Sequence, residues 1–440
     1  MNGILMNATV ADRLSGVLPL RGGIAPPTAG GDRFVTLFAK RIAVCLALVV
    51  AVLGPVGAAA QQAEPQAWDG QHLSDQPANV QAMFQAGWAD KAAQQWAKEH
   101  STALLKEVSA AHGVPISATS VIADGPPIAA DTTVTALNWT KTNAPITGDL
   151  IDIDQGRHML YVGHAATDSI EVYDVSTSVP KWMKSFHVPG GAAGILIATD
   201  IQKLYAGTAN GMAIIDANPS SATYGTEFAT IYLGPGGTDE LDYDPVDHKV
   251  YVTDVGDHNI GSVDSNTNQL SKVYSGFDES QIEQPRWNPT DGMIYVAFRL
   301  TNKLAKFNPK TDTLVSLTDI GVPCTPSGVA IKPTTNMALL GCRANPGPGL
   351  VYWNLTTNTL DHTVPNATGV DGAIYNAKAD RFFAAASRWH RGPVMAILDG
   401  SGNFLTNVPT TIQSHQVGYD QTNHVVYTLG GGLVSFSTPF

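Results

Sequence analysis

The sequence has few cysteines and none of the short motifs that mark common catalytic or cofactor sites. Only three of its 440 residues are cysteine. One of them, Cys45, lies in an N-terminal apolar segment, and the other two are too few for a structural metal–thiolate site. No Gly-rich phosphate loop joins a strand to a helix, and G-x-S-x-G, H-E-x-x-H and C-x-x-C are all absent. These absences argue against the P-loop nucleotide-binding, serine-hydrolase and zinc-protease classes that those motifs define.

Basic residues are also scarce. The chain has 26 Lys and Arg against 38 Asp and Glu, which gives a net charge of −12. Without residues 1–60, 21 basic and 36 acidic residues remain and the net charge is −15. Such a surface repels phosphate backbones, so we expect no nucleic-acid partner.

Long apolar runs are absent as well, since Ile42–Leu53 is too short to span a bilayer comfortably. Lys40-Arg41 precede this run and small residues ending at Ala60 follow it, which is the order of a secretory signal peptide. We predict a signal region over residues 1–60 with cleavage after Ala60, and therefore an exported protein, periplasmic or secreted, with no transmembrane span in the mature chain. An uncleaved anchor is the alternative. The 39 residues ahead of Lys40 are long for a signal peptide and also fit a start codon placed too early.

A repeat organises the rest of the chain. Seven anchors lie 44 or 46 residues apart, each preceded and followed by strand-like runs and turns: Tyr161, Tyr205, Tyr251, Tyr295, Leu339, Phe383 and Tyr427. A period of this length, built from strands and turns, is typical of one propeller blade per repeat. We predict an all-β, seven-bladed β-propeller over residues 133–440.

The last repeat has room for only three strands before Phe440. Thr133–Trp139 alternates and is rich in β-branched residues, as strands are. We expect this N-terminal strand to supply the missing outermost strand of the last blade, which leaves no long open edge.

Residues 61–132 are expected to form a helical extension and a linker. Phe84, Trp88 and Trp96 fall at helical spacing, and Gly113 is a suitable C-terminal stop. The helix is predicted to pack against the propeller wall or base, with a plug or a partner-binding helix as the alternative. Residues 114–132 contain three prolines and read as the linker.

The pattern Tyr251-Val252-Thr253-Asp254, followed by Ile260 and Val263-Asp264, resembles the YVTN-type (YncE-like) family of seven-bladed propellers. Similar pieces begin at Tyr161 and Tyr295, and the resemblance covers roughly residues 133–440. Asp254 stands where the family has Asn. Family members are mostly binding or uncharacterised exported proteins, so the resemblance implies an exported repeat protein and assigns no activity.

The repeat register identifies residues that should meet at the mouth of the central channel. Twelve residues before the anchors stand Asp149, Ala193, Asp239, Glu283, Ser327, Asp371 and His415. Equivalent positions in a closed ring converge on one axis, so the acids among them should share a small volume. We predict a divalent metal (Ca²⁺, Mg²⁺, Mn²⁺ or Zn²⁺) held by Asp149, Asp239, Glu283, Asp371 and His415. The alternative is that these acids form turns by accepting hydrogen bonds from nearby backbone amides.

The ends of the second strands supply further candidates at the same rim. His164 is the predicted general base or acid, because an imidazole titrates near working pH. Asp254, Arg299 and Arg343 are predicted to bind substrate, with ion bridges to the acidic ring as the alternative for the two arginines. The loop of the sixth repeat adds a candidate binding lip made of Arg388, Trp389 and His390.

Cys324 and Cys342 fall 15 residues before and three residues after the anchor Leu339. These positions lie near the same end of one hairpin. In an exported protein we predict a disulfide between them, and two free thiols are the alternative.

Two functions follow from these residues. The first is an exported binding module that recognises a small molecule or a protein or envelope ligand at the channel mouth, on one face, together with a divalent cation. The alternative is a metal-dependent hydrolase or lactonase-like enzyme, or a lyase, that acts on a small anionic or sugar-derived substrate.

Overall fold

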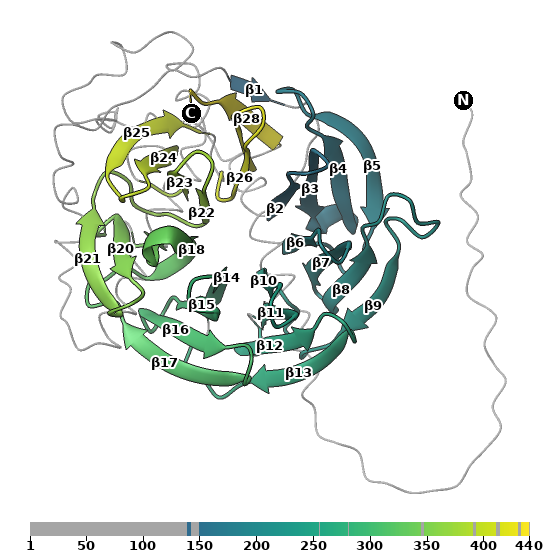
Figure 1. Ribbon diagram of the computed structural model, residues 1–440, viewed down its shortest axis with the longest axis horizontal. Coiled ribbons are helices and arrows are strands. Elements are labelled where there is room, and N and C mark those ends of the chain that lie inside the picture. The colour runs from purple at the N-terminus through teal and green to yellow at the C-terminus, as the bar shows by residue number, and fades with distance from the viewer. Residues whose placement is uncertain are drawn as a thin grey trace, which may run out of the picture. The chain divides into compact units, whose positions relative to one another are not determined.

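Seven four-stranded antiparallel sheets form a ring in the computed structural model (Figure 1). The structure describes residues 139–141 and 149–439, apart from 255, 280, 345–346, 390–392, 411–413 and 430–432. Two short 3₁₀ helices, Ala165–Thr167 and Pro333–Thr335, accompany the strands. The predicted all-β, seven-bladed propeller is confirmed.

Each sheet is one blade, and in the first six blades the chain runs through the four strands from the channel outward. The innermost strands are β2 (Ile151–Asp154), β6 (Ile195–Ala198), β10 (Leu241–Asp244), β14 (Ile282–Asn288), β18 (Pro326–Lys332), β22 (Ala373–Asn376) and β26 (Val417–Asp420). The second strands, which carry the anchors, are β3 (Met159–His164), β7 (Lys203–Thr208), β11 (Lys249–Asp254), β15 (Met293–Phe298), β19 (Met337–Cys342), β23 (Arg381–Ala386) and β27 (Val425–Leu429).

The outer half of each blade completes the sheet. The third strands are β4 (Ser169–Asp174), β8 (Gly211–Asp216), β12 (Asn259–Asp264), β16 (Lys303–Asn308), β20 (Leu350–Asn354), β24 (Val394–Asp399) and β28 (Leu433–Ser437). The outermost strands are β5 (Lys181–His187), β9 (Glu227–Ile231), β13 (Gln269–Tyr274), β17 (Thr313–Asp319), β21 (Thr359–Val364), β25 (Phe404–Pro409) and, in the seventh blade, β1 (Trp139–Lys141).

The N-terminal strand closes the ring as predicted, although with different bounds. Strand β1 pairs antiparallel with β28, with Trp139 opposite Phe436. The predicted strand Thr133–Trp139 overlaps β1 only at Trp139, because residues 133–138 lie outside the described residues. Joining the first strand to the last sheet means that the seventh blade cannot form until both ends of the propeller have met.

The apolar core is divided among seven clusters, and each cluster lies between two neighbouring blades. One of them joins Tyr251 and Ile260 of the third blade to Val296 and Phe307 of the fourth. The ring of Tyr251 stands 5.9 Å from that of Phe307, centroid to centroid. All seven anchors are almost fully buried in this way. The repeated large side chain therefore stabilises contacts between blades as well as within them.

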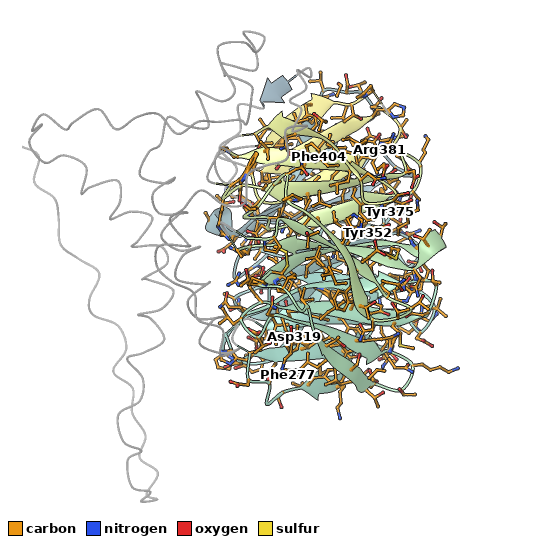
Figure 2. The ribbon with its side chains drawn as sticks, turned by 90° about the vertical axis from the view of Figure 1, so that its left-hand side faces the viewer. Phe277, Asp319, Tyr352, Tyr375, Arg381 and Phe404 are labelled. Atoms are coloured by element: carbon orange, nitrogen blue, oxygen red, sulfur yellow. A yellow bond between two sulfur atoms is a disulfide. The ribbon has the colours of Figure 1, made fainter. Side chains whose placement is uncertain are left out.

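Aromatic side chains continue this packing between the fifth and sixth blades. Tyr352 of β20 meets Phe382 of β23 edge to face, with centroids 5.9 Å apart, and the ring of Tyr375 of β22 also packs against Phe382, with centroids 4.8 Å apart. Tyr352 and Tyr375 lie close together at the side of the disc in Figure 2. The Tyr352 hydroxyl donates to the carbonyl of Gly400 at 3.0 Å, so this buried phenol is satisfied.

The turns between the first and second strands share one backbone feature. The residue three before each anchor has a positive φ: His158, Gln202, His248, Gly292, Asn336, Asp380 and His424. Asn, Asp and His tolerate the left-handed region better than most residues, and Gly enters it without strain. His158, His248 and His424 are therefore turn residues, and His424 also contacts the Tyr419 hydroxyl through Nδ1 at 3.1 Å.

The predicted signal region, helical extension and linker lie outside the described residues. Within the part of the chain that the structure describes, no helix is long and apolar enough to cross a membrane.

Gly292 provides a test of the turn geometry. Its φ is 69°, and a side chain there would meet open space, so only the backbone conformation limits substitution. We expect Gly292→Asn to change the free energy of unfolding little, and Gly292→Val to lower it by about 1–2 kcal/mol, because a β-branched residue is strained at this φ. Denaturant titrations of the two variants give the comparison, and equal stabilities would contradict it.

Candidate functional site at the channel mouth

Five of the seven residues that stand twelve before the anchors contact another member of the set, because each lies near the start of an innermost strand. Ser327 Oγ lies 3.0 Å from Oε2 of Glu283 and 2.9 Å from Oδ1 of Asp371, so one hydroxyl links three consecutive blades. On the other side, His415 Nε2 lies 2.6 Å from Oδ1 of Asp149, which joins the seventh blade to the first. The register read from the sequence therefore places these side chains at one rim.

Arginines from the loops after the second strands reach into this rim. Arg299 pairs with Glu283, and Arg343 Nη1 lies 2.5 Å from Oδ1 of Asp371 and 3.8 Å from Oε2 of Glu283. Arg388 Nη1 approaches the second oxygen of Asp371 at 3.6 Å. Arg299, Arg343 and Arg388 thus form ion bridges to the acidic ring, and we call these three residues with Glu283, Ser327 and Asp371 the mouth network.

The mouth network is held largely away from solvent, which strengthens its interactions. The side chains of Glu283 and Asp371 are only 10% and 8% exposed. Burial lowers the pKa of Arg343, but Asp371 and Glu283 outweigh it and raise that pKa above its usual value. Burial dominates at Arg299 and lowers its pKa. The paired charges make the network a fixed element of the rim, since removing one partner would leave a buried charge uncompensated.

The five predicted metal ligands do not converge on a common point in this arrangement. Glu283 and Asp371 face arginines, and Asp149 faces His415. Asp239 lies in the loop before β10, where its N–H donates to the carbonyl of Thr253 at 2.9 Å. Among the described residues, no group of three or more His, Cys, Asp or Glu side chains is placed to hold a metal ion. As arranged, these side chains do not form a donor set that fits a metal.

His164, the predicted catalytic residue, lies at the end of β3 and faces outward along the first blade. Its Nδ1 is 3.9 Å from Oε1 of Glu171 on β4. That carboxylate also accepts hydrogen bonds from the Ser185 hydroxyl at 2.6 Å and from the Trp182 indole at 2.7 Å. Hydrogen bonds from these groups outweigh burial and lower the pKa of Glu171. His164 therefore lies beside a group of polar side chains on the first blade, formed by Glu171, Trp182 and Ser185.

Asp254, predicted to bind substrate, stabilises the loop after β11. Its Oδ1 accepts the N–H groups of Gly256 at 3.0 Å and Asp257 at 2.9 Å. The side chain is fully buried, and burial, together with the nearby Asp257 carboxyl, raises the pKa of Asp254 to about 6. A carboxyl that accepts two backbone amides in this way is a turn former.

The predicted binding lip is divided. Arg388 joins the mouth network, as described above, with its side chain 18% exposed. Trp389 is 3% exposed and packs in the apolar cluster between the fifth and sixth blades, beside Ala386 and Val394. His390 lies outside the described residues.

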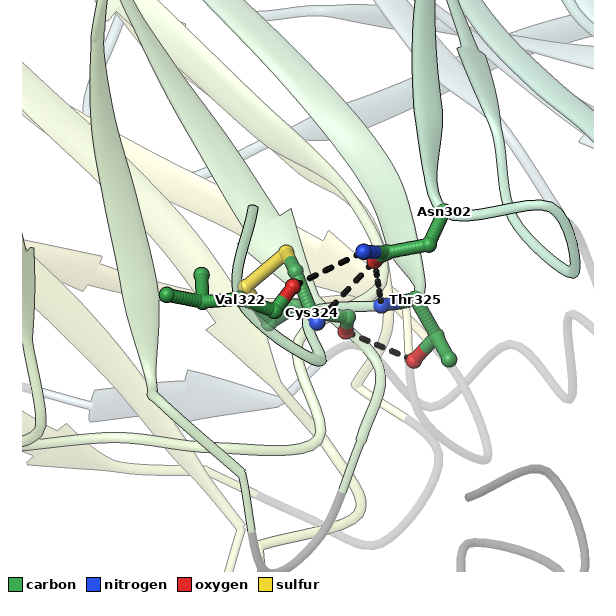
Figure 3. Close-up of a disulfide and its surroundings, with 5 residues drawn as sticks. Asn302, Val322, Cys324 and Thr325 are labelled. Carbon is green, nitrogen blue, oxygen red and sulfur yellow. Dashed lines mark hydrogen bonds between the residues drawn. A yellow bond between two sulfur atoms is a disulfide. The ribbon is translucent and has the colours of Figure 1, made fainter. Parts of the chain in front are cut away.

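A disulfide joins Cys324, in the loop before β18, to Cys342 at the end of β19 (Figure 3). Asn302 supports the loop: its Oδ1 accepts the N–H groups of Cys324 at 3.0 Å and Thr325 at 2.9 Å, and its Nδ2 donates to Val322 O at 2.8 Å. Arg343, which follows Cys342 in the sequence, donates its N–H to Thr325 O at 3.0 Å. The disulfide therefore fixes the backbone from which Arg343 enters the mouth network.

A second set of charged residues lies deeper in the channel, on the innermost strands. Asp152 Oδ2 accepts the N–H of Ile197 at 2.8 Å, and Asp242 Oδ2 accepts that of Trp287 at 2.5 Å, in each case from the next blade. Burial raises the pKa of Asp152 to about 6 and also raises that of Asp242, while Arg286 acts in the opposite direction on both. These carboxylates link neighbouring blades.

Asp152, Asp242 and Arg286 are not among the site residues predicted from the sequence, although the repeat contains the signal. All three stand nine residues before an anchor. Glu240, eleven residues before Tyr251, is not among the predicted site residues either, and it is 7% exposed. The repeat register that locates the strand starts also locates these positions.

Comparison with known proteins supports the fold. No family model matches the chain, and no curated protein matches it. The crystal structure of a mitotic checkpoint complex contains a chain that is 14% identical, with a TM-score of 0.57, covering 71% of this chain and 94% of that one. The 440-residue protein is thus a seven-bladed β-propeller. The RRP9 WD40 repeats are 8% identical, with a TM-score of 0.54, over 70% and 99% of the two chains. At these identities the likeness concerns fold alone, and the resemblance to the YVTN-type family stays a prediction.

The disulfide allows a first test of the site. It closes a loop of 18 residues in sequence separation, so the Cys324→Ala/Cys342→Ala variant should lose about 2–4 kcal/mol of unfolding free energy in denaturant titrations. A reductant should lower the stability of the wild type by a similar amount and leave the variant unchanged. Equal stability of the reduced and oxidised wild type would contradict the expected contribution.

Asp152 allows a second test, through pH. Its folded pKa of about 6 lies above the usual 3.8, so the folded state binds the proton more tightly than the unfolded state. The stability from this group is complete below about pH 4 and is lost as the pH rises through 6. Asp152→Asn cannot ionise, so its stability relative to the wild type should increase by roughly 1–3 kcal/mol between pH 4 and pH 7.

Denaturant titrations at several pH values measure this difference. Asp247→Asn, which removes a partly buried acid from the turn between β10 and β11, is the control for the change in net charge. A stability difference between Asp152→Asn and the wild type that does not vary with pH would contradict the pKa assignment.

Proposed function

We propose that the chain is an exported binding propeller, of the YVTN type, that takes a small molecule or a protein or envelope ligand at the channel mouth. The mouth network carries this proposal. It holds three guanidinium groups and two carboxylates in fixed positions on consecutive blades. Ion pairs between these arginines and carboxylates keep them there. Charged groups whose positions are already set lose little entropy when a ligand arrives, which is what a recognition site requires.

Export is supported by two separate features. The basic, apolar and small-residue order of residues 40–60 is that of a signal peptide. The Cys324–Cys342 pairing in the structure suits an oxidising compartment. The fold is shared with many proteins that bind partners, and fold alone does not select the ligand.

A metal-dependent form of this module, or a metal-dependent hydrolase, lactonase-like enzyme or lyase, is the second proposal. It rests on the same five residues, Asp149, Asp239, Glu283, Asp371 and His415. A cation here would have to displace Arg299 and Arg343 from the carboxylates they contact. Divalent cations therefore belong in the same test as organic ligands.

Ligand-induced stabilisation tests the binding site. Three proteins, the wild type, Arg388→Gln and Lys310→Gln, are compared by thermal melting as full chains. Each is screened against amines, carboxylates, sugars, short peptides and divalent chlorides. Lys310 is exposed in a turn at the opposite end of the blades and gives the same change in charge. A ligand at a hundred times its Kd adds about 2.7 kcal/mol of stability. We expect the wild type and Lys310→Gln to show this shift and Arg388→Gln to lose most of it.

The contrary outcomes are distinct. A compound that stabilises Arg388→Gln as strongly as the wild type binds away from the mouth. Stabilisation by a divalent cation that Asp371→Asn abolishes would favour the metal-dependent form.

A further inference from the structure

Glu240 is a buried carboxyl at the mouth whose hydrogen bonding is incomplete. It lies between Asp239 and the start of β10, and the residue is 7% exposed. Its backbone is satisfied, because its N–H donates to Thr253 Oγ1 at 3.2 Å and its carbonyl accepts the N–H of Thr253 at 3.0 Å. Its Oε2 is buried and has no hydrogen-bond partner among the described residues.

The neighbouring repeat shows what this side chain would ordinarily do. Gln284 occupies the equivalent position in the fourth blade, and its Oε1 accepts the N–H of Val329, 45 residues later in the fifth blade, at 2.8 Å. The residue 45 after Glu240 is Pro285, which has no N–H. Proline therefore removes the donor that the fold provides at this position, and leaves the acceptor on Glu240 unused.

An acceptor buried without a donor is destabilising, and more so when it is charged. The surroundings favour a positively charged donor. The charged neighbours of Glu240 include three acids, Asp239, Glu283 and Asp371, and two cations, Arg286 and Arg343. Across the rim, the carboxyl groups of Asp149, Asp239, Glu240, Glu283 and Asp371 outnumber the guanidinium groups of Arg299, Arg343 and Arg388.

We propose that Glu240 binds a primary ammonium group of the ligand, which donates an N–H to Oε2. This inference rests on the proposed function, because it names the chemistry that the mouth selects. An alkylammonium is compact, carries three donors and supplies positive charge, whereas a divalent metal would need a cluster of ligands that the described residues do not form. The group has two sources, a free amine or a lysine side chain of a partner.

Calorimetric titration of the full chain tests the proposal and separates the sources. The probes are n-butylammonium chloride and the peptide acetyl-Ala-Lys-Ala-amide, with n-butanol and acetyl-Ala-Gln-Ala-amide as uncharged matches. We expect at least one charged probe to bind and neither uncharged probe to do so. Glu240→Gln should weaken binding at least tenfold, and Glu227→Gln, the same change on the outer strand β9, should leave it unchanged.

Pro285→Ala is a second variant with an independent expectation. It restores the N–H opposite Glu240, which then competes with the ammonium group, so binding should weaken although Glu240 is intact. The proposal is overturned if the charged probes bind Glu240→Gln as tightly as the wild type. It is also overturned if they fail to bind while another compound binds in an Arg388-dependent manner, and in that case the mouth keeps its binding role. If no compound binds the wild type at all, both proposals fail.

Discussion

The inner edges of the seven first strands impose the constraint on which this propeller depends. Each of these strands pairs on one side only, so its other edge presents backbone N–H and C=O groups to a narrow channel. Side chains of the preceding blade satisfy several of them: Asp152 accepts from Ile197, Asp242 from Trp287 and Gln284 from Val329. Elsewhere the blades meet directly, as where Gly194 leaves room for the carbonyl of Asp239. These contacts fix the blades relative to one another at the axis.

The same constraint gives the channel its electrostatic character. Carboxyl and amide oxygens are the groups that accept backbone N–H bonds, so acids gather on the innermost strands and at the starts of those strands. The arginines of the fourth to sixth blades then neutralise the rim where the acids are closest. The mouth network is thus a consequence of closing the ring, and its fixed charges are also what a ligand meets. Glu240 stands out because proline has taken away its donor, and no arginine is its ion-pair partner among the described residues.

The repeat made most of the fold predictable. Tyr251 and its six equivalents are large buried side chains on the second strands, so their spacing reports directly on blade number. The same repeat register predicts which residues line the rim. Four of them lie where it places them: Glu283, Ser327, Asp371 and His415. The partners of these residues could not be predicted. Whether Arg343 holds a substrate or Asp371 depends on distances between blades, which no pattern within one repeat contains. His164 shows the same limit, because its orientation toward Glu171 is set by the twist of one sheet.

What the sequence determined by itself is therefore periodic and local: the number of blades, the order of the strands, the turn residues with positive φ and the side chains that share a rim. These follow from backbone conformation and from the alternation of buried and exposed positions, which neighbouring residues specify. Tertiary structure alone decided which rim residues pair with one another, because an ion pair such as Arg343 with Asp371 forms only when separate blades are brought to one axis. It also decided that Trp389 is buried between blades, and that Oε2 of Glu240 is buried without a hydrogen-bond partner among the described residues.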